Sequence, residues 1–91
     1  MMDRPDLFVI GRLLEGLGSG PLRRTQLQQR AGLNYTVFLR YLDYLVYLKL
    51  VAVRPDDEGR LELTPRGAEA YRFLSDGLAR IFQFDGYPRT P

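Results

Sequence analysis

The sequence predicts a mainly α-helical fold with one small β-hairpin, and three features carry this prediction. Ala31 and Gly32 stand between two helical segments, where a small side chain allows close helix packing and glycine allows a positive φ. Asn34 can cap the helix that follows. The acidic segment 56–59 separates two short apolar runs, as in a hairpin. In this order the elements form a winged helix-turn-helix, followed by a C-terminal helix suited to dimerisation.

Two helices are expected near the start of the chain. From Asp6 to about Leu17, apolar residues recur at helical spacing, and the glycines within residues 16–20 end that helix. Thr25 is expected to cap a short second helix, whose Leu27 faces the core.

The third helix is predicted from Tyr35 to Leu48, in the place of the helix that enters a DNA groove in this fold. Its core-facing residues recur at positions i, i+3, i+4 and i+7. These residues are Phe38, Tyr41, Leu42 and Leu45.

The two strands of the hairpin, or wing, are predicted at residues 51–54 and 60–63. Thr64 and Pro65 suit the cap and the first turn of a fourth helix, which is expected to run to about Gln83. One winged-helix domain therefore covers residues 1–83, with residues 64–83 as its C-terminal helix. Residues 84–91 are expected to form an irregular tail.

Composition narrows the range of functions. A chain of 91 residues makes one small domain, which disfavours an enzyme with a large buried site. The absence of cysteine and histidine excludes thiol nucleophiles, imidazole bases and zinc sites built from these residues. We therefore expect no enzyme activity, no metal and no cofactor. The net charge of +2 permits nucleic-acid binding without requiring it.

The distribution of apolar residues argues against a membrane protein. No apolar run approaches the ~20 residues that span a bilayer, and no signal peptide is visible. We expect a cytoplasmic protein without membrane association, located on the nucleoid if it binds DNA.

Four short segments occur in order along the chain, from about Leu7 to Leu78. They are Gly20-Pro-Leu-Arg-Arg-Thr-Gln-Leu27, Leu33-Asn-Tyr-Thr36, Tyr41-Leu42 and Leu63-Thr-Pro-Arg-Gly67. Together they resemble the small archaeal winged-helix DNA-binding proteins, a group of transcriptional regulators and chromatin-associated proteins. The resemblance implies double-stranded DNA as the partner, the third helix as the recognition helix, and a homodimer formed through the C-terminal helix.

The candidate DNA-binding residues lie on three elements. Those beside the second helix suit phosphate, those at the start of the third helix suit base edges or phosphate, and those flanking the wing suit the backbone or the minor groove. They are Arg23, Arg24, Thr25 and Gln26; Asn34, Tyr35, Thr36 and Arg40; and Arg54 and Arg60. Alternatives stay open for several of them: Arg23 and Arg24 form only a solvated loop, Asn34 acts only as a helix cap, and Tyr35 only packs on the first turn of its helix. The wing arginines, in turn, pair with the wing acids instead of DNA.

Apolar residues of the fourth helix recur at a spacing close to that of a coiled coil. They are Tyr71, Leu74, Leu78 and Ile81, with Phe82 beside them. We favour a homodimer contact for this stripe. Packing of the helix on the first helix of the same chain is the alternative.

The third helix departs from the family that the chain resembles. Members usually carry basic residues on its outer face and a glycine at its end, whereas Arg40 is the one arginine within this helix and Lys49 follows it. Several residues outside the core stripe are apolar instead: Val37, Leu39, Tyr44, Tyr47 and Leu48. The sequence therefore also allows a protein-protein interaction module that docks a partner on this helix. Alternatively, the other helices or a dimer mate cover most of these residues.

Overall fold

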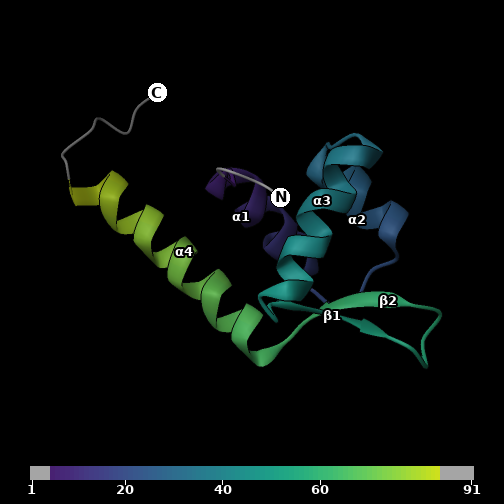
Figure 1. Ribbon diagram of the computed structural model, residues 1–91. Coiled ribbons are helices and arrows are strands. Elements are labelled where there is room, and N and C mark those ends of the chain that lie inside the picture. Colours follow the sequence, from purple (N-terminus) through teal and green to yellow (C-terminus); the bar gives the residue numbers. More distant parts are fainter. Residues whose placement is uncertain (1–4, 85–91) are drawn as a thin grey trace.

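A computed structural model describes residues 5–84, with the side chains of 78 and 81–84 excepted. Within this range the chain forms four helices and one antiparallel hairpin (Figure 1). The elements are α1 (Leu7–Leu17), α2 (Arg24–Ala31), α3 (Tyr35–Tyr47), β1 (Val51–Arg54), β2 (Arg60–Leu63) and α4 (Pro65–Phe84). The predicted mainly helical fold with one hairpin and the order of its elements are confirmed, whereas a dimerisation role of the C-terminal helix stays a prediction. The predicted tail lies outside the described residues, apart from Phe84, which belongs to α4.

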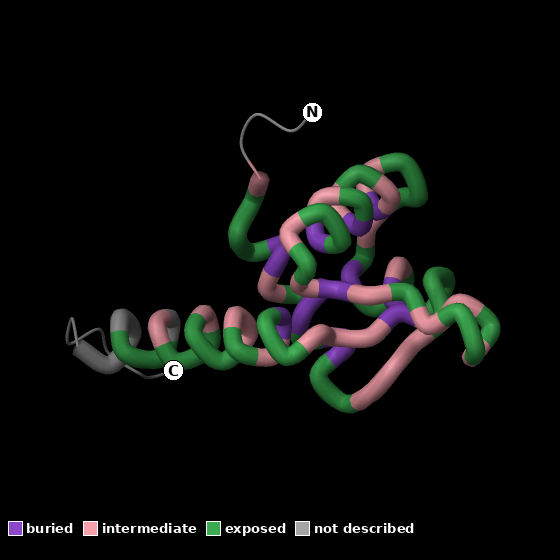
Figure 2. Tube along the Cα trace, turned by 60° about the horizontal axis from the view of Figure 1, so that its bottom comes forward, coloured by how far each residue is buried: buried purple, intermediate pink, exposed green. Residues whose placement is uncertain are grey.

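One apolar core joins α1, α2, α3 and both strands (Figure 2). Among the described residues no polar side chain is buried in it. Each fully buried leucine contributes about 1.5–3 kcal/mol to stability. The core residues are Val9, Ile10, Leu13, Leu14 and Leu17 from α1; Leu27 and Ala31 from α2; Phe38, Leu42 and Leu45 from α3; and Val51 and Leu61 from the strands.

Tyr41 lies at the edge of this core rather than inside it. Its ring is half-buried against the core cluster, and its hydroxyl accepts a hydrogen bond from the backbone N of Asp6 at 2.9 Å. The Asp6 carboxylate in turn accepts from the backbone N of Phe8 at 2.8 Å and caps α1. The tyrosine therefore holds the start of α1 against the middle of α3.

The hairpin is extended by a residue that the sequence did not identify as part of the sheet. β1 and β2 pair with Val51 opposite Leu63 and Arg54 opposite Arg60. Leu22, in the segment before α2, forms a β-bridge with Leu61 through backbone hydrogen bonds of 3.0 and 2.8 Å. This bridge fixes the wing relative to the start of α2.

The backbones of α4 and the α3–β1 connection pass each other closely at Leu50. The hydroxyl of Thr64 donates to the carbonyl of Lys49 at 2.6 Å and accepts from the backbone N of Gly67 at 2.9 Å, so Thr64 caps α4 as predicted. The backbone N of Thr64 also donates to the carbonyl of Leu50 at 3.0 Å. A Cβ atom at Gly67 would collide with that carbonyl oxygen, so only glycine fits there.

The helices α2 and α3 end in the same way, although different residues adopt the required conformation. Gly32 follows α2 with φ of 67°, as predicted for the turn, and Lys49 follows α3 with φ of 63°. In both cases the next residue donates to a carbonyl of the last helical turn: Leu33 to Gln28 at 3.3 Å and Leu50 to Leu45 at 2.9 Å. Lys49 therefore does what a glycine would do, with the strain of a left-handed non-glycine residue.

Gly67→Ala tests the close passage at Leu50. We expect it to lower the free energy of unfolding by about 1–3 kcal/mol, because the added methyl group forces the α4 and Leu50 backbones apart. Gly77→Ala on the same helix is the matched control, since no described atom beyond the adjacent residues and the nearby backbone of α4 lies within 4 Å of the added Cβ. This control should raise stability by up to ~1 kcal/mol. Urea unfolding that gives equal effects for both variants would contradict the assigned role of Gly67.

Candidate nucleic-acid interface

The start of α2 carries the first group of predicted DNA-binding residues. The helix begins at Arg24, so Arg23 holds the N-cap position and Thr25 lies inside the first turn. The prediction that Thr25 caps α2 is therefore wrong. Gln26 serves this end of the helix instead, because its Oε1 accepts from the backbone N of Arg23 at 2.9 Å. The sequence signal for this contact is a glutamine at the third helical position.

The first turn of α2 offers backbone donors as well as charge. Arginine has no acceptor on its side chain, and no side-chain cap hydrogen bond forms at Arg23. The backbone N–H groups of the first turn have no partner inside the helix. Arg24 and Thr25 are exposed beside them. This end of α2 therefore combines backbone donors, the positive end of the helix dipole and an arginine, which together suit a phosphate.

Asn34 caps α3, which is one of the two roles considered for it. Its Oδ1 accepts from the backbone N of Val37 at 2.9 Å, and α3 begins at the next residue, Tyr35. The amide nitrogen of Asn34 is not used by this contact. A DNA contact of Asn34 stays a prediction, compatible with the cap.

The outer face of α3 begins polar and becomes apolar toward its end. Thr36 and Arg40 are exposed and lie one helical turn apart, so both project from one face. Asp43 and Tyr47 continue that face, and Tyr47 is 79% exposed. Among the described residues Arg40 has no ion-pair partner. Arg40 can therefore contact a ligand of α3 without first breaking an ion pair.

Most of the apolar residues that set α3 apart are partly covered. Leu39 and Tyr44 pack against the core cluster, and Val37 and Leu48 are half-buried. Tyr47 remains in solvent. The folded chain itself therefore accounts for much of the apolar surplus on this helix.

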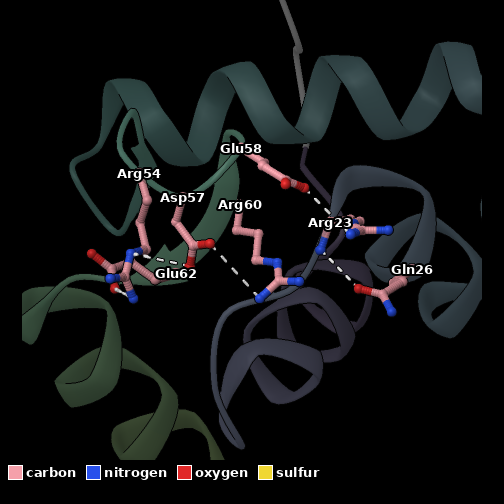
Figure 3. Close-up of polar contacts among 7 residues, drawn as sticks. All are labelled: Arg23, Gln26, Arg54, Asp57, Glu58, Arg60 and Glu62. Atoms are coloured by element: carbon pink, nitrogen blue, oxygen red, sulfur yellow. Dashed lines mark hydrogen bonds and ion pairs between the residues drawn. The ribbon is translucent and has the colours of Figure 1, made fainter.

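The wing arginines are paired with wing acids in this structure (Figure 3). Arg54 lies 3.8 Å from Asp57 and 3.5 Å from Glu62, measured between guanidinium nitrogen and carboxylate oxygen. Arg60 lies 3.8 Å from the other oxygen of Asp57. The structure therefore shows the alternative considered for Arg54 and Arg60, namely pairing with the wing acids. A DNA phosphate could still replace these carboxylates as the partner of each arginine. The contact of Arg54 and Arg60 with DNA therefore stays a prediction.

A further ion pair joins the start of α2 to the tip of the wing. A guanidinium nitrogen of Arg23 lies 3.3 Å from the carboxylate of Glu58, 35 positions along the chain. No local sequence pattern predicts this contact, because it depends on the Leu22–Leu61 bridge that brings the two segments together. Both side chains are largely exposed, so the pair contributes little to stability, on the order of 0.2–1 kcal/mol.

The described part of the predicted dimerisation stripe packs within the chain. Tyr71 and Leu74 are half-buried against the core cluster, as the alternative of intramolecular packing requires. With Leu7 and Phe8 they also line an apolar groove of about 330 Å³ between α1 and α4. Phe73, on the same helix, is 76% exposed. The side chains of the remaining predicted residues, Leu78, Ile81 and Phe82, lie outside the described residues.

The described residues contain neither a metal-ligating cluster nor a membrane-spanning helix. In residues 5–84 no acidic side chains gather into a group that could hold a metal ion. No helix in this range is long and apolar enough to cross a membrane.

Comparison with known proteins identifies the family. The family model described as winged helix-turn-helix matches residues 4–78 of this chain, which include all helices and both strands except the end of α4. The chain belongs to the winged helix-turn-helix family. The match spans the elements that carry the candidate interface: the α2 start, α3 and the wing.

A solved structure shares the fold of this winged-helix chain. It is the crystal structure of Sso10a-2, described as a DNA-binding protein from Sulfolobus solfataricus. The TM-score is 0.61 with 21% sequence identity, and the alignment covers 97% of this chain and 100% of that chain. A search of curated proteins gives no significant match. The resemblance to archaeal winged-helix proteins is thereby confirmed at the level of fold.

Substitutions at Asn34 separate the cap from any DNA contact. Asn34→Ala should lower the free energy of unfolding by about 1 kcal/mol, because the N–H of Val37 loses its acceptor. Asn34→Ser keeps a capping oxygen and should leave thermal unfolding nearly unchanged. Unchanged stability of Asn34→Ala would contradict the cap. A loss of DNA affinity in Asn34→Ser would assign the amide a role beyond the cap.

Proposed function

We propose that this winged-helix chain binds double-stranded DNA and acts as a homodimeric transcriptional regulator in the cytoplasm, on the nucleoid. The family assignment and the DNA-binding description of Sso10a-2 support the choice of partner. The observation that carries the proposal is the exposed polar face at the start of α3, formed by Thr36 and Arg40. In a winged-helix protein this face is the part of the recognition helix that approaches base edges.

In this proposal each element has a distinct task. The start of α2 binds phosphate through Arg24 and the backbone N–H groups beside Thr25. Tyr35 and Thr36 hydrogen-bond phosphate or base edges, and Arg40 donates two hydrogen bonds to a guanine in the major groove. Arg23, Arg54 and Arg60 reach the neighbouring backbone, with the wing beside the minor groove.

The homodimer is proposed to form through α4. This helix extends away from the three-helix core, on the side opposite the wing, and the Cα trace measures 46 Å along its longest axis, against 25 and 24 Å in the other directions (Figure 1). Its exposed Phe73 is one apolar surface that a second copy would cover, and the apolar groove between α4 and α1, on another side of the helix, is a second. Two copies place two recognition helices on one DNA site, which is how symmetric regulators gain affinity and select half-site spacing.

A protein-protein interaction module is the second candidate function. The exposure of Tyr47 at the end of α3, with Val46 and Val53 each 40% exposed, favours it. In that case the apolar end of α3 would dock a protein partner, and the arginines would be a solvated surface.

Arg40→Ala tests the DNA contact of α3. If Arg40 reads a base, DNA affinity should fall by about 1–3 kcal/mol and preference at one base position should relax. Arg72→Ala, an exposed arginine on α4, is the matched control and should change the dissociation constant by less than about twofold. Equal effects of Arg40→Ala and Arg72→Ala in fluorescence anisotropy would contradict the proposed role of α3.

Arg24→Glu distinguishes the two functions, since it should abolish DNA binding and leave a protein partner bound.

Phe73→Glu tests the homodimer. A charge in the apolar α4 contact should raise the dimer dissociation constant by about thirtyfold, the equivalent of ~2 kcal/mol for a central interface residue. Tyr47→Glu introduces the same charge at an equally exposed aromatic residue on α3 and should leave the dimer intact. Sedimentation velocity over a range of concentrations measures both. A wild-type chain that stays monomeric at high concentration would rule out the homodimer.

A further inference from the structure

The acidic tip of the wing has no role in the proposed function, and a carboxylate there opposes DNA phosphate. Residues 54–62 contain two arginines and four acidic residues, which gives this hairpin a net charge of −2. Like charges that meet across an interface oppose binding. The wing therefore carries a feature that DNA binding alone does not explain.

We infer that the wing is a built-in competitor for the DNA phosphates: in the unbound protein, Asp57 and Glu58 occupy Arg23, Arg54 and Arg60, and DNA has to displace them. This inference rests on the proposed function, because it concerns the regulation of the same site. The sequence makes each of the three arginines a candidate for DNA contact: Arg23 for phosphate, and Arg54 and Arg60 for the backbone or the minor groove. Each is found on a wing carboxylate, at distances of 3.3 to 3.8 Å.

Backbone hydrogen bonds of the turn hold these acids in position. The backbone N of Gly59 donates to the carbonyl of Arg54 at 3.0 Å, and that of Arg60 donates to the carbonyl of Asp57 at 3.0 Å. Glu58 and Gly59 both have positive φ, 55° and 71°. This turn places Asp57 between Arg54 and Arg60, so that its two carboxylate oxygens face one arginine each. Figure 3 shows Glu58 directed toward Arg23 on the other side.

The same geometry makes the exchange possible. Charge-assisted N–H···O bonds are typically about 2.7–2.9 Å long, and all these contacts are longer. The paired groups are also at least one-third exposed, so water already screens them. A phosphate can offer the same guanidinium two short hydrogen bonds. The wing carboxylates are therefore held weakly enough for DNA to displace them. Their pairing with the arginines nevertheless lowers the affinity of the protein for DNA.

Glu58→Gln measures the competition directly, and Asp56→Asn is its matched control. Both substitutions remove one negative charge from the same wing turn, but among the described residues Asp56 has no arginine partner. Glu58→Gln should therefore tighten DNA binding more than Asp56→Asn, by roughly 1.5- to 5-fold, the range of an exposed ion pair. Anisotropy titrations with one mixed-sequence duplex at low salt give these ratios.

The same two substitutions in an Arg23→Ala protein separate the specific Arg23–Glu58 pairing from general repulsion between the wing and DNA. In Arg23→Ala the partner of Glu58 is gone, so the extra gain of Glu58→Gln over Asp56→Asn should disappear. Equal gains for the two substitutions in the wild-type background, or a gain that persists in Arg23→Ala, would overturn the competitor. If neither the wild-type chain nor any variant binds DNA, the proposed function itself fails and the competitor with it. Thermal unfolding of each variant confirms that the fold is retained.

Discussion

The relative placement of α3, the wing and α4 depends on the close passage of two backbone segments at Leu50. Its backbone N closes α3 on Leu45, and its carbonyl accepts from Thr64 just before α4. Because β1 follows Leu50 directly, this crossing joins the end of α3, the start of the wing and the start of α4. Gly67 is required there for lack of space rather than for flexibility. The Leu63-Thr-Pro-Arg-Gly67 segment therefore marks the fold because its residues build this crossing.

The sequence predicted those features that are encoded locally. Periodic apolar residues located the helices, and Gly32, Asn34 and Thr64 marked the helix ends where side chain and backbone chemistry leave little choice. Contacts between distant segments were not predicted, because no local sequence pattern encodes them. The Leu22–Leu61 bridge and the Arg23–Glu58 ion pair each join segments that only tertiary packing brings together. The predicted cap of α2 was wrong. Threonine is a favoured N-cap residue, but α2 already begins at Arg24, one residue before Thr25.

Three of the five arginines that the proposed function assigns to DNA are paired with carboxylates of the same chain. Arg24 and Arg40 are exposed, and among the described residues neither is in an ion pair. Arg23, Arg54 and Arg60 are held by carboxylates of the wing. Under the proposed function, such a protein binds DNA through few initial contacts and gains others as the wing pairs open.

The most direct measurement is fluorescence anisotropy of the wild-type protein with mixed-sequence duplex DNA, titrated at several salt concentrations. We expect micromolar or tighter binding at low salt, with an affinity that falls linearly in a log–log plot against salt. The slope should be near −0.9 for each phosphate contacted. Absence of binding even at low salt would contradict the account and direct attention to a protein partner at the apolar end of α3.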